Sequence, residues 1–231
     1  MVGLNTSRTK KALEKISLEL ILGIIAALAL LGLFSKLSDE LLENELQGFD
    51  MFISNVIYSL QTPWLTNFMI FITHAGDTYT YVIVVLIILI LLLRIQLKWE
   101  ALILLISVLG AWGLNTVLKG SFQRARPDLE HLVEVGGYSF PSGHAMVSIA
   151  AYGIMGYLYV RYLRRNGKRY WPIVLLVSVW IFLIGLSRIY LHVHYPSDVI
   201  AGYSAGGVWL LTCIYALTIL NRWTVRRKVN G

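Results

Sequence analysis

Cysteine, proline and charge are all scarce in this chain. Its 231 residues include one cysteine, Cys213, which excludes a disulfide framework and a metal site built on several cysteines. Charged residues make up 14% of the chain, whereas a soluble globular domain carries about a quarter. Hydrophobic residues make up 57%, and the mean hydropathy is +0.66. The composition therefore indicates a polytopic membrane protein, and the length suits a single domain over residues 1–231.

Long apolar runs predict six membrane spans and hence an all-α fold. The first run is long for a signal peptide and lacks a convincing cleavage site, so we interpret it as an uncleaved span. Residues 36–75 are acidic and then amphipathic, which predicts one or two short interfacial helices between the first and second spans. The alternative, a poorer span in that segment, would reverse all later topology. The expected spans are residues 16–34, 79–93, 101–118, 141–160, 171–186 and 199–220.

The distribution of basic residues predicts the orientation. All but five of the 20 Lys and Arg residues fall on one side of a six-span arrangement. Positive charge marks the cytoplasmic side, so we expect both termini there and a multi-pass protein in the cell membrane. Anionic lipid and topology explain the net charge of +7, and no nucleic-acid partner is expected. The five outward basic residues are Lys36, Lys119, Arg124, Arg126 and Arg188.

Three polar segments fall together on the outer face. They are residues 119–127, 138–144 and 187–198, which read KGSFQRARP, YSFPSGH and SRIYLHVHYPSD. Pro196 suits the first turn of a helix, which would place Asp198 in that turn, four residues after His194. A carboxylate so placed can fix the tautomer of an imidazole and support its charged form. The alternative is a structural cap at the mouth of a membrane helix.

The same segments contain the groups that hold and cleave a phosphate. Arg126 and Arg188 can donate two parallel hydrogen bonds each, and Lys119 adds a third cation. Ser142 and Gly143 lie at an expected helix start, where free backbone N–H groups favour an anion. Two histidines, His144 and His194, can then supply the acid and the nucleophile that phosphoester cleavage requires.

With these three segments, the chain resembles the type 2 phosphatidic acid phosphatases, which are integral membrane lipid phosphatases. The family pattern is Lys, six residues, Arg-Pro, then Pro-Ser-Gly-His, then Ser-Arg, five residues, His, three residues, Asp. All three parts match within residues 119–198, and residues 73–76 resemble a family segment more weakly. The resemblance implies that His194 attacks phosphorus, Asp198 orients it and His144 protonates the leaving oxygen. It also implies that no metal or cofactor is needed and that phosphate is bound by Lys119, Arg126, Ser142, Gly143 and Arg188.

The resemblance implies a hydrolase that removes a terminal phosphate from a membrane lipid at the outer leaflet. The small size and short loops resemble bacterial members, so phosphatidylglycerol phosphate and undecaprenyl diphosphate are the expected substrates. A lipid phosphotransferase using the same phosphohistidine is an alternative. A phosphate or anion transporter is another, although the polar residues lie at span ends and transporter sites lie near the midplane.

Some residues remain outside this scheme. Arg124 is not a motif position, and we expect it to face solvent or lipid headgroups. His192 and His194 form a His-x-His pair, for which metal binding is an alternative. We expect His74 and His131 to lie in outer loops without a role in the site. Small-residue patterns, with Gly110 and Gly113 in one span and Gly202 and Gly206 in another, predict close helix packing.

Overall fold

The computed structural model describes residues 6–230, together with the side chains of residues 20–221 and of residue 223. The basic side chains at the two ends of the chain, which contribute to the orientation argument, lie outside the described residues. Within residues 6–230 every regular element is an α-helix, which confirms the predicted all-α class. The helices are α1 (Thr6–Leu42), α2 (Gln47–Tyr58), α3 (Pro63–His74), α4 (Thr78–Arg94), α5 (Lys98–Phe122), α6 (Gly143–Arg165), α7 (Trp171–Tyr190) and α8 (Pro196–Asn230).

The long helices coincide with the expected spans, and α2 and α3 are the expected short helices between the first and second. Among the described helices, four are long and apolar enough by composition to cross a membrane: Leu20–Leu42 within α1, Lys98–Phe122, Trp171–Tyr190 and Pro196–Asn221 within α8. α3 and α4 qualify only as a pair, with a bend of 50° between them. α6 does not qualify, because small and polar residues occupy much of it. The apolar helices confirm a membrane-type helical bundle, and six spans remain a prediction.

The small residues of α6 and α8 allow their backbones to approach closely. A side chain at Gly202 would place its Cβ 2.6 Å from the carbonyl oxygen of Ser142, and one at Gly206 would lie 2.6 Å from that of Met146. This confirms the predicted small-residue packing between helices. Gly110 likewise allows Trp209 to pack against α5, whereas Gly113 faces open space. α6 also packs against α5 and α7, so it occupies the centre of the bundle.

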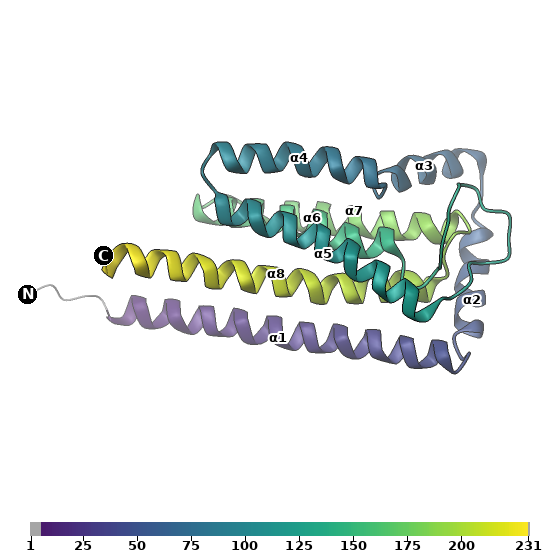
Figure 1. Cartoon of the computed structure of the whole chain (residues 1–231), viewed down its shortest axis with the longest axis horizontal. Helices are drawn as coiled ribbons and strands as arrows, with labels where there is room; N and C mark the ends of the chain where they lie inside the picture. Colours follow the sequence, from purple (N-terminus) through teal and green to yellow (C-terminus); the bar gives the residue numbers. More distant parts are fainter. Residues whose placement is uncertain (1–5, 231) are drawn as a thin grey trace, which may run out of the picture.

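The polar loops gather at one end of the bundle (Figure 1). The loop of residues 123–142 joins α5 to α6, and residues 191–195 join α7 to α8. α2 lies across this same end and contacts α7 and α8. The short turns at residues 95–97 and 166–170 lie at the other end, where α1 begins and α8 finishes. The expected motif segments therefore converge at a single end of the molecule.

Candidate active site

His194 lies in the loop between α7 and α8, and its side chain is 2% exposed. α8 begins at Pro196, so Asp198 lies in the first turn as predicted. Its Oδ2 is 3.3 Å from His194 Nδ1, and the hydroxyl of Ser139 is 3.2 Å from the same nitrogen. Because a carboxylate accepts a hydrogen bond, the imidazole proton belongs on Nδ1 and leaves a lone pair on Nε2. Burial lowers the pKa of His194 to about 3, so the ring is neutral at physiological pH.

Asp198 is held by donors on both of its oxygens. Oδ2 accepts hydrogen bonds from the Ser139 hydroxyl at 2.5 Å and from the Tyr195 backbone N–H at 2.8 Å. Oδ1 accepts a hydrogen bond from Arg124 at 2.6 Å. The carboxylate is fully buried, and these bonds compensate for its burial. The sequence motifs do not include Ser139, which no periodicity or spacing signal distinguishes.

His144, the second residue of α6, faces a carboxylate that the sequence analysis missed. Asp77, between α3 and α4, lies with Oδ1 3.1 Å from His144 Nε2. The other oxygen of Asp77 lies 2.7 Å from His74 Nδ1. The hydrogen bond from His144 lowers the pKa of Asp77 to about 2, and His74 contributes to the same effect. His74 was expected to lie outside the site, which is wrong, and the family-like segment just before Asp77 was the available signal.

Gly76 explains how Asp77 can approach His144 so closely. A Cβ at this position would overlap the His144 ring and crowd Ile184 of α7. The turn between α3 and α4 can therefore lie directly against α6 and α7 only with glycine here.

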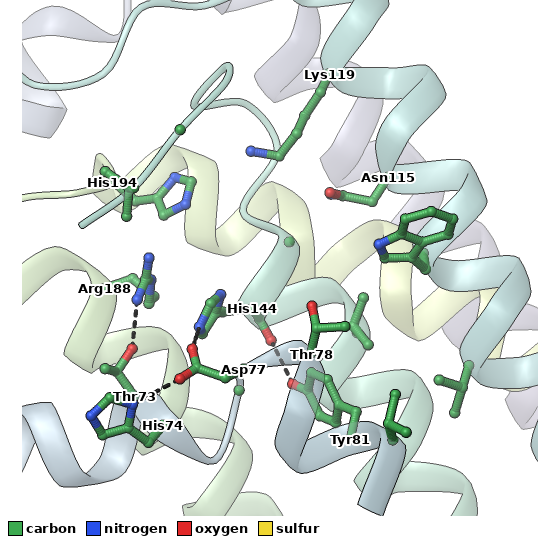
Figure 2. A pocket seen from close by; sticks show the side chains of 18 of the residues that line it. Thr73, His74, Asp77, Thr78, Tyr81, Asn115, Lys119, His144, Arg188 and His194 are labelled. Atoms are coloured by element: carbon green, nitrogen blue, oxygen red, sulfur yellow. Dashed lines mark hydrogen bonds and ion pairs between the residues drawn. The ribbon is translucent and has the colours of Figure 1, made fainter. Parts of the chain in front are cut away.

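Three cations, Lys119, Arg126 and Arg188, line the same space, and Figure 2 shows Lys119 and Arg188. Arg188 is 4% exposed and donates to the hydroxyl of Thr73 at 2.6 Å, and its Nε has no hydrogen-bond partner among the described residues. Lys119 donates to the carbonyl of Tyr138. Arg126 donates to the carbonyl of Val193 at 2.6 Å, and the same nitrogen is 3.3 Å from His194 Nε2. Burial of a cation without a paired carboxylate is costly, which favours an anionic ligand at this position.

Arg126 also organises the loop that carries it. Its Nε and Nη2 donate to the carbonyls of Gly137 and Gly136 at 3.0 and 2.8 Å. The guanidinium therefore ties the 123–142 loop to the loop that carries His194, and it offers Nη1 to the space beside Nε2.

The start of α6 lies beside this space. Gly143 lines it, and a Cβ there would lie 2.9 Å from the amide oxygen of Asn115. Ser142 is fully buried behind Gly143, and its backbone N–H donates to the carbonyl of Asp198 at 2.9 Å. The Ser142 hydroxyl has no hydrogen-bond partner among the described residues and does not line the cavity.

Arg124 does not face solvent or headgroups, so that expectation is wrong. Its side chain is 12% exposed, and it forms ion pairs at 2.6 Å with Asp198 and with Asp50 of α2. Asp50 lies 74 residues away in the chain, and no local pattern predicts that α2 folds over this loop. The sequence offered one indication of a role for Arg124: it is one of only five basic residues predicted on the outer side, whereas the other Lys and Arg residues are predicted on the cytoplasmic side.

The remaining histidines are occupied by neighbouring groups. His192 Nδ1 donates to the carbonyl of Glu130 at 2.9 Å, and its Nε2 is 2.6 Å from the amide nitrogen of Gln61. His131 Nε2 lies 3.1 Å from the carbonyl of Pro127. Among the residues whose placement is described, no group of three His, Cys, Asp or Glu side chains is arranged to hold a metal ion.

A cavity of about 950 Å³ connects these groups to an apolar passage. At its polar end it is lined by Lys119, Arg126, His144, Arg188 and His194, with Asp77 beside them. Away from that end the lining comes from α4 and α5 and is almost entirely apolar, including Tyr81, Val82, Val85, Leu86, Leu105, Val108, Leu109 and Trp112.

Comparison with known proteins agrees with this site. Residues 100–222 match the PAP2 superfamily. The chain is 32% identical over 163 residues to phosphatidylglycerophosphatase B of Bacillus subtilis, which covers 71% of this chain and 80% of that protein. It is 30% identical over 170 residues to an undecaprenyl-diphosphatase of Sulfolobus acidocaldarius, covering 71% and 75%.

A solved structure shares the fold as well. The crystal structure of a transmembrane PAP2-type phosphatidylglycerolphosphate phosphatase from Bacillus subtilis superposes with a TM-score of 0.77 at 30% identity, covering 85% of this chain and 96% of that one. The match of residues 100–222 spans the three motif segments and the helices that hold them together. On sequence and on fold, the chain belongs to the PAP2 superfamily.

Proposed function

We propose that this protein is a membrane lipid phosphatase that removes a terminal phosphate through a phosphohistidine on His194. The observation that carries the proposal is the neutral, buried His194, whose Nε2 faces a cavity containing three cations and a second histidine. A nucleophile, a proton donor and a phosphate-binding set are the parts that a phosphoester cleavage requires.

In the first half of the proposed reaction, the Nε2 lone pair attacks phosphorus. The bond from phosphorus to the leaving oxygen breaks, and that oxygen takes a proton from His144. Asp198 stabilises the positive charge that develops on the His194 ring, to which it lies hydrogen-bonded at Nδ1. Lys119, Arg126 and Arg188 offset the charge on the phosphoryl oxygens as they become equatorial.

In the second half, water replaces the leaving group. A water oxygen attacks phosphorus while His144 takes a proton from it, and the phosphorus–nitrogen bond breaks with its electron pair returning to Nε2. Asp77 supports the protonated form of His144 in both halves, because its carboxylate accepts the Nε2 hydrogen. Because Nε2 of His144 faces Asp77, Nδ1 of His144 is the nitrogen that exchanges a proton with the leaving group and with water.

The shape of the cavity supports a lipid substrate. Val82, Leu86, Leu109 and Trp112 line its apolar part and are each about half or more exposed on the outer surface of the bundle. A phosphate at the polar end would therefore place its acyl or prenyl chain between α4 and α5, in contact with the bilayer. The names of the relatives support phosphatidylglycerol phosphate and undecaprenyl diphosphate as the substrates to test first.

The site end of the bundle is proposed to face away from the cytoplasm. Six spans follow if α6, enclosed by its neighbours, crosses the membrane and α4 crosses with its N-terminal end extended by α3. Arg94, Lys98 and the basic residues 161–169 lie at the end opposite the cavity, which is the cytoplasmic end by the charge bias. Both termini would then be cytoplasmic.

The test is phosphate release from a panel of lipid phosphates in detergent containing EDTA. The native protein is compared with His194→Ala and with His131→Ala, a matched change at an exposed histidine. We expect release by the native protein and by His131→Ala, and none by His194→Ala. Loss of all release in EDTA would contradict the mechanism, and phosphate appearing on a second lipid would indicate a phosphotransferase.

A phosphoenzyme assay tests the intermediate directly. Substrate carrying ³²P is mixed with the protein and quenched in alkali, because phosphohistidine survives base and is lost in acid. We expect label on the native protein and none on His194→Ala. Label on His194→Ala would assign the nucleophile to another residue.

A further inference from the structure

Arg124 and Asp50 are not motif positions and do not line the cavity, yet both are largely buried: Arg124 forms an ion pair with Asp198, and Asp50 forms one with Arg124. We propose that they are positioning residues for His194: Asp50 of α2 holds Arg124, and Arg124 holds Asp198 in the orientation that faces His194. This inference rests on the proposed function, because it assigns a role within that reaction. It also makes α2 a part of the active-site support.

The first step of the argument is the geometry of the guanidinium. Its Nη1 lies 2.6 Å from Asp198 Oδ1, and its Nη2 lies 2.6 Å from Asp50 Oδ2. The planar guanidinium of Arg can donate to two carboxylates at fixed relative positions, which the single ammonium group of Lys cannot. The ring of Tyr195 covers the guanidinium at 4.1 Å, so the fork is also fixed from one face.

The second step is that the two carboxylate oxygens of Asp198 accept hydrogen bonds from different donors. Oδ1 accepts from Arg124, and Oδ2 faces His194, Ser139 and the Tyr195 N–H. With donors on both sides, the carboxylate cannot rotate without breaking a charge-assisted hydrogen bond. Arg124 therefore keeps the other oxygen turned to the Nδ1 hydrogen of His194.

The third step is the attachment of Asp50. Its side chain is 1% exposed, and it accepts hydrogen bonds from the Ser197 backbone N–H at 2.9 Å and from the Ser197 hydroxyl at 2.7 Å. Arg124 also donates to that hydroxyl at 2.8 Å. Asp50 thus fixes both the guanidinium and the residue immediately before Asp198, and it does so from a separate helix.

The fourth step is charge. Asp50 and Asp198 are both buried, and Arg124 is the cation between them. Without Arg124, two buried carboxylates would lie close together with no cation between them. Their repulsion would favour protonation of one of them. A protonated Asp198 cannot stabilise a positive His194 ring. The other ionisable groups around Asp198 and His194 come from several elements and are not altered by the change: Lys119, Arg126, Arg188 and Tyr195.

The experiment compares Arg124→Gln, Arg124→Lys and Asp50→Asn with Arg94→Gln and Asp39→Asn, two changes of the same kind at exposed positions. We expect kcat to fall about 100-fold in Arg124→Gln and about 10-fold in Asp50→Asn, with KM within about threefold of native, because the phosphate-binding cations remain. Arg124→Lys should recover part of the loss by keeping the charge. The two exposed variants should match the native protein.

A second readout does not depend on turnover. In protein labelled with ¹⁵N-histidine, NMR distinguishes a protonated from an unprotonated ring nitrogen, and His194→Gln assigns the His194 signals. We expect the Nδ1–H tautomer in the native protein, and a mixture of tautomers or a protonated ring in Arg124→Gln. If the native protein releases no phosphate, the proposed function fails, and these spectra alone decide the positioning role.

Two outcomes would overturn the proposal. One is kcat and His194 signals unchanged in folded Arg124→Gln. The other is activity lost in proportion to folded protein, with the His194 tautomer intact in the folded fraction, since that describes a purely structural ion pair. If Arg124→Gln does not fold, Arg124→Lys and Asp50→Asn decide by the same two measurements.

Discussion

Replacing Asp77 by Asn removes the negative charge beside His144 while keeping the size of the side chain. In the native protein the two are hydrogen-bonded at 3.1 Å, and Asp77 also holds His74 at 2.7 Å. If His144 donates the proton to the leaving oxygen, it must be positively charged at the start of each cycle, and the carboxylate supports that state. We therefore expect Asp77→Asn to slow the departure of the leaving group and to leave phosphate binding unchanged.

The size of the effect follows from distance and exposure. Two unit charges 3.1 Å apart attract by about 5 kcal/mol at an effective dielectric constant of about 20. The Asp77 side chain is 38% exposed, so solvent screening reduces this to roughly 1.5 to 3 kcal/mol. The lowering of the Asp77 pKa from 3.8 to about 2, caused first by the hydrogen bond from His144, has the same direction. The expected loss is about 10- to 100-fold in kcat/KM.

Two substrates with different leaving groups form the assay. A lipid phosphate monoester must release an alkoxide, which needs a proton, whereas p-nitrophenyl phosphate releases a stable phenolate. We expect kcat/KM of Asp77→Asn to fall for the lipid and to change less than about threefold for p-nitrophenyl phosphate. The matched control is Asp128→Asn, an exposed carboxylate of the outer loop.

An equal fall for both substrates would refute this reasoning, because a group that acts through the general acid cannot slow a reaction that needs no acid. An unchanged rate for the lipid would also refute it, since the charge beside His144 would then have no catalytic consequence. Melting temperatures of the two variants in detergent separate these outcomes from loss of folded protein.

Three further outcomes are expected. Asp198→Asn should lower kcat by about 10³- to 10⁴-fold in the phosphate-release assay, because an amide cannot support the charged His194 ring. Gly206→Val should destabilise the fold by about 1 to 3 kcal/mol and lower the melting temperature, because its Cβ would lie 2.6 Å from the Met146 carbonyl oxygen. Stability should fall as pH falls: His194 stays neutral when folded, with a pKa of about 3, while the unfolded chain takes up a proton below about 6.5. This costs about 2 kcal/mol between pH 7 and pH 5, and His194→Gln should remove that part of the slope in thermal melts.

The helical class and the motif residues were predictable because their signals are local. Apolar runs that are long enough to cross a bilayer can only be helices or barrel strands, and these runs have helical length. His194 and Asp198 meet because Pro196 begins a helix between them and so determines their separation. The start of α6 at Gly143 follows in the same way from the short polar segment before an apolar run.

The partners of those residues were not predictable from local patterns. Asp77 meets His144 across 67 residues, and Arg124 meets Asp50 across 74. The sequence predicts an exposed Arg124, because water can solvate the guanidinium of an arginine in an outer loop. The burial of Arg124 becomes favourable only because α2 lies across the end of the bundle and brings Asp50 to the guanidinium.

The sequence by itself determined an all-helical membrane bundle and a set of His, Asp and cationic residues within residues 119–198. Periodicity, helix starts and fixed spacings are properties of short segments, so they can be recognised in the sequence without knowing how the helices pack. The tertiary structure alone decided which carboxylate supports which histidine, that Ser139 and Arg124 donate to Asp198 while Asp50 holds Arg124, and that an apolar passage between α4 and α5 leads to the site. Those features depend on how helix ends and loops from distant segments pack against one another, and burial there sets the charge state and orientation of each group.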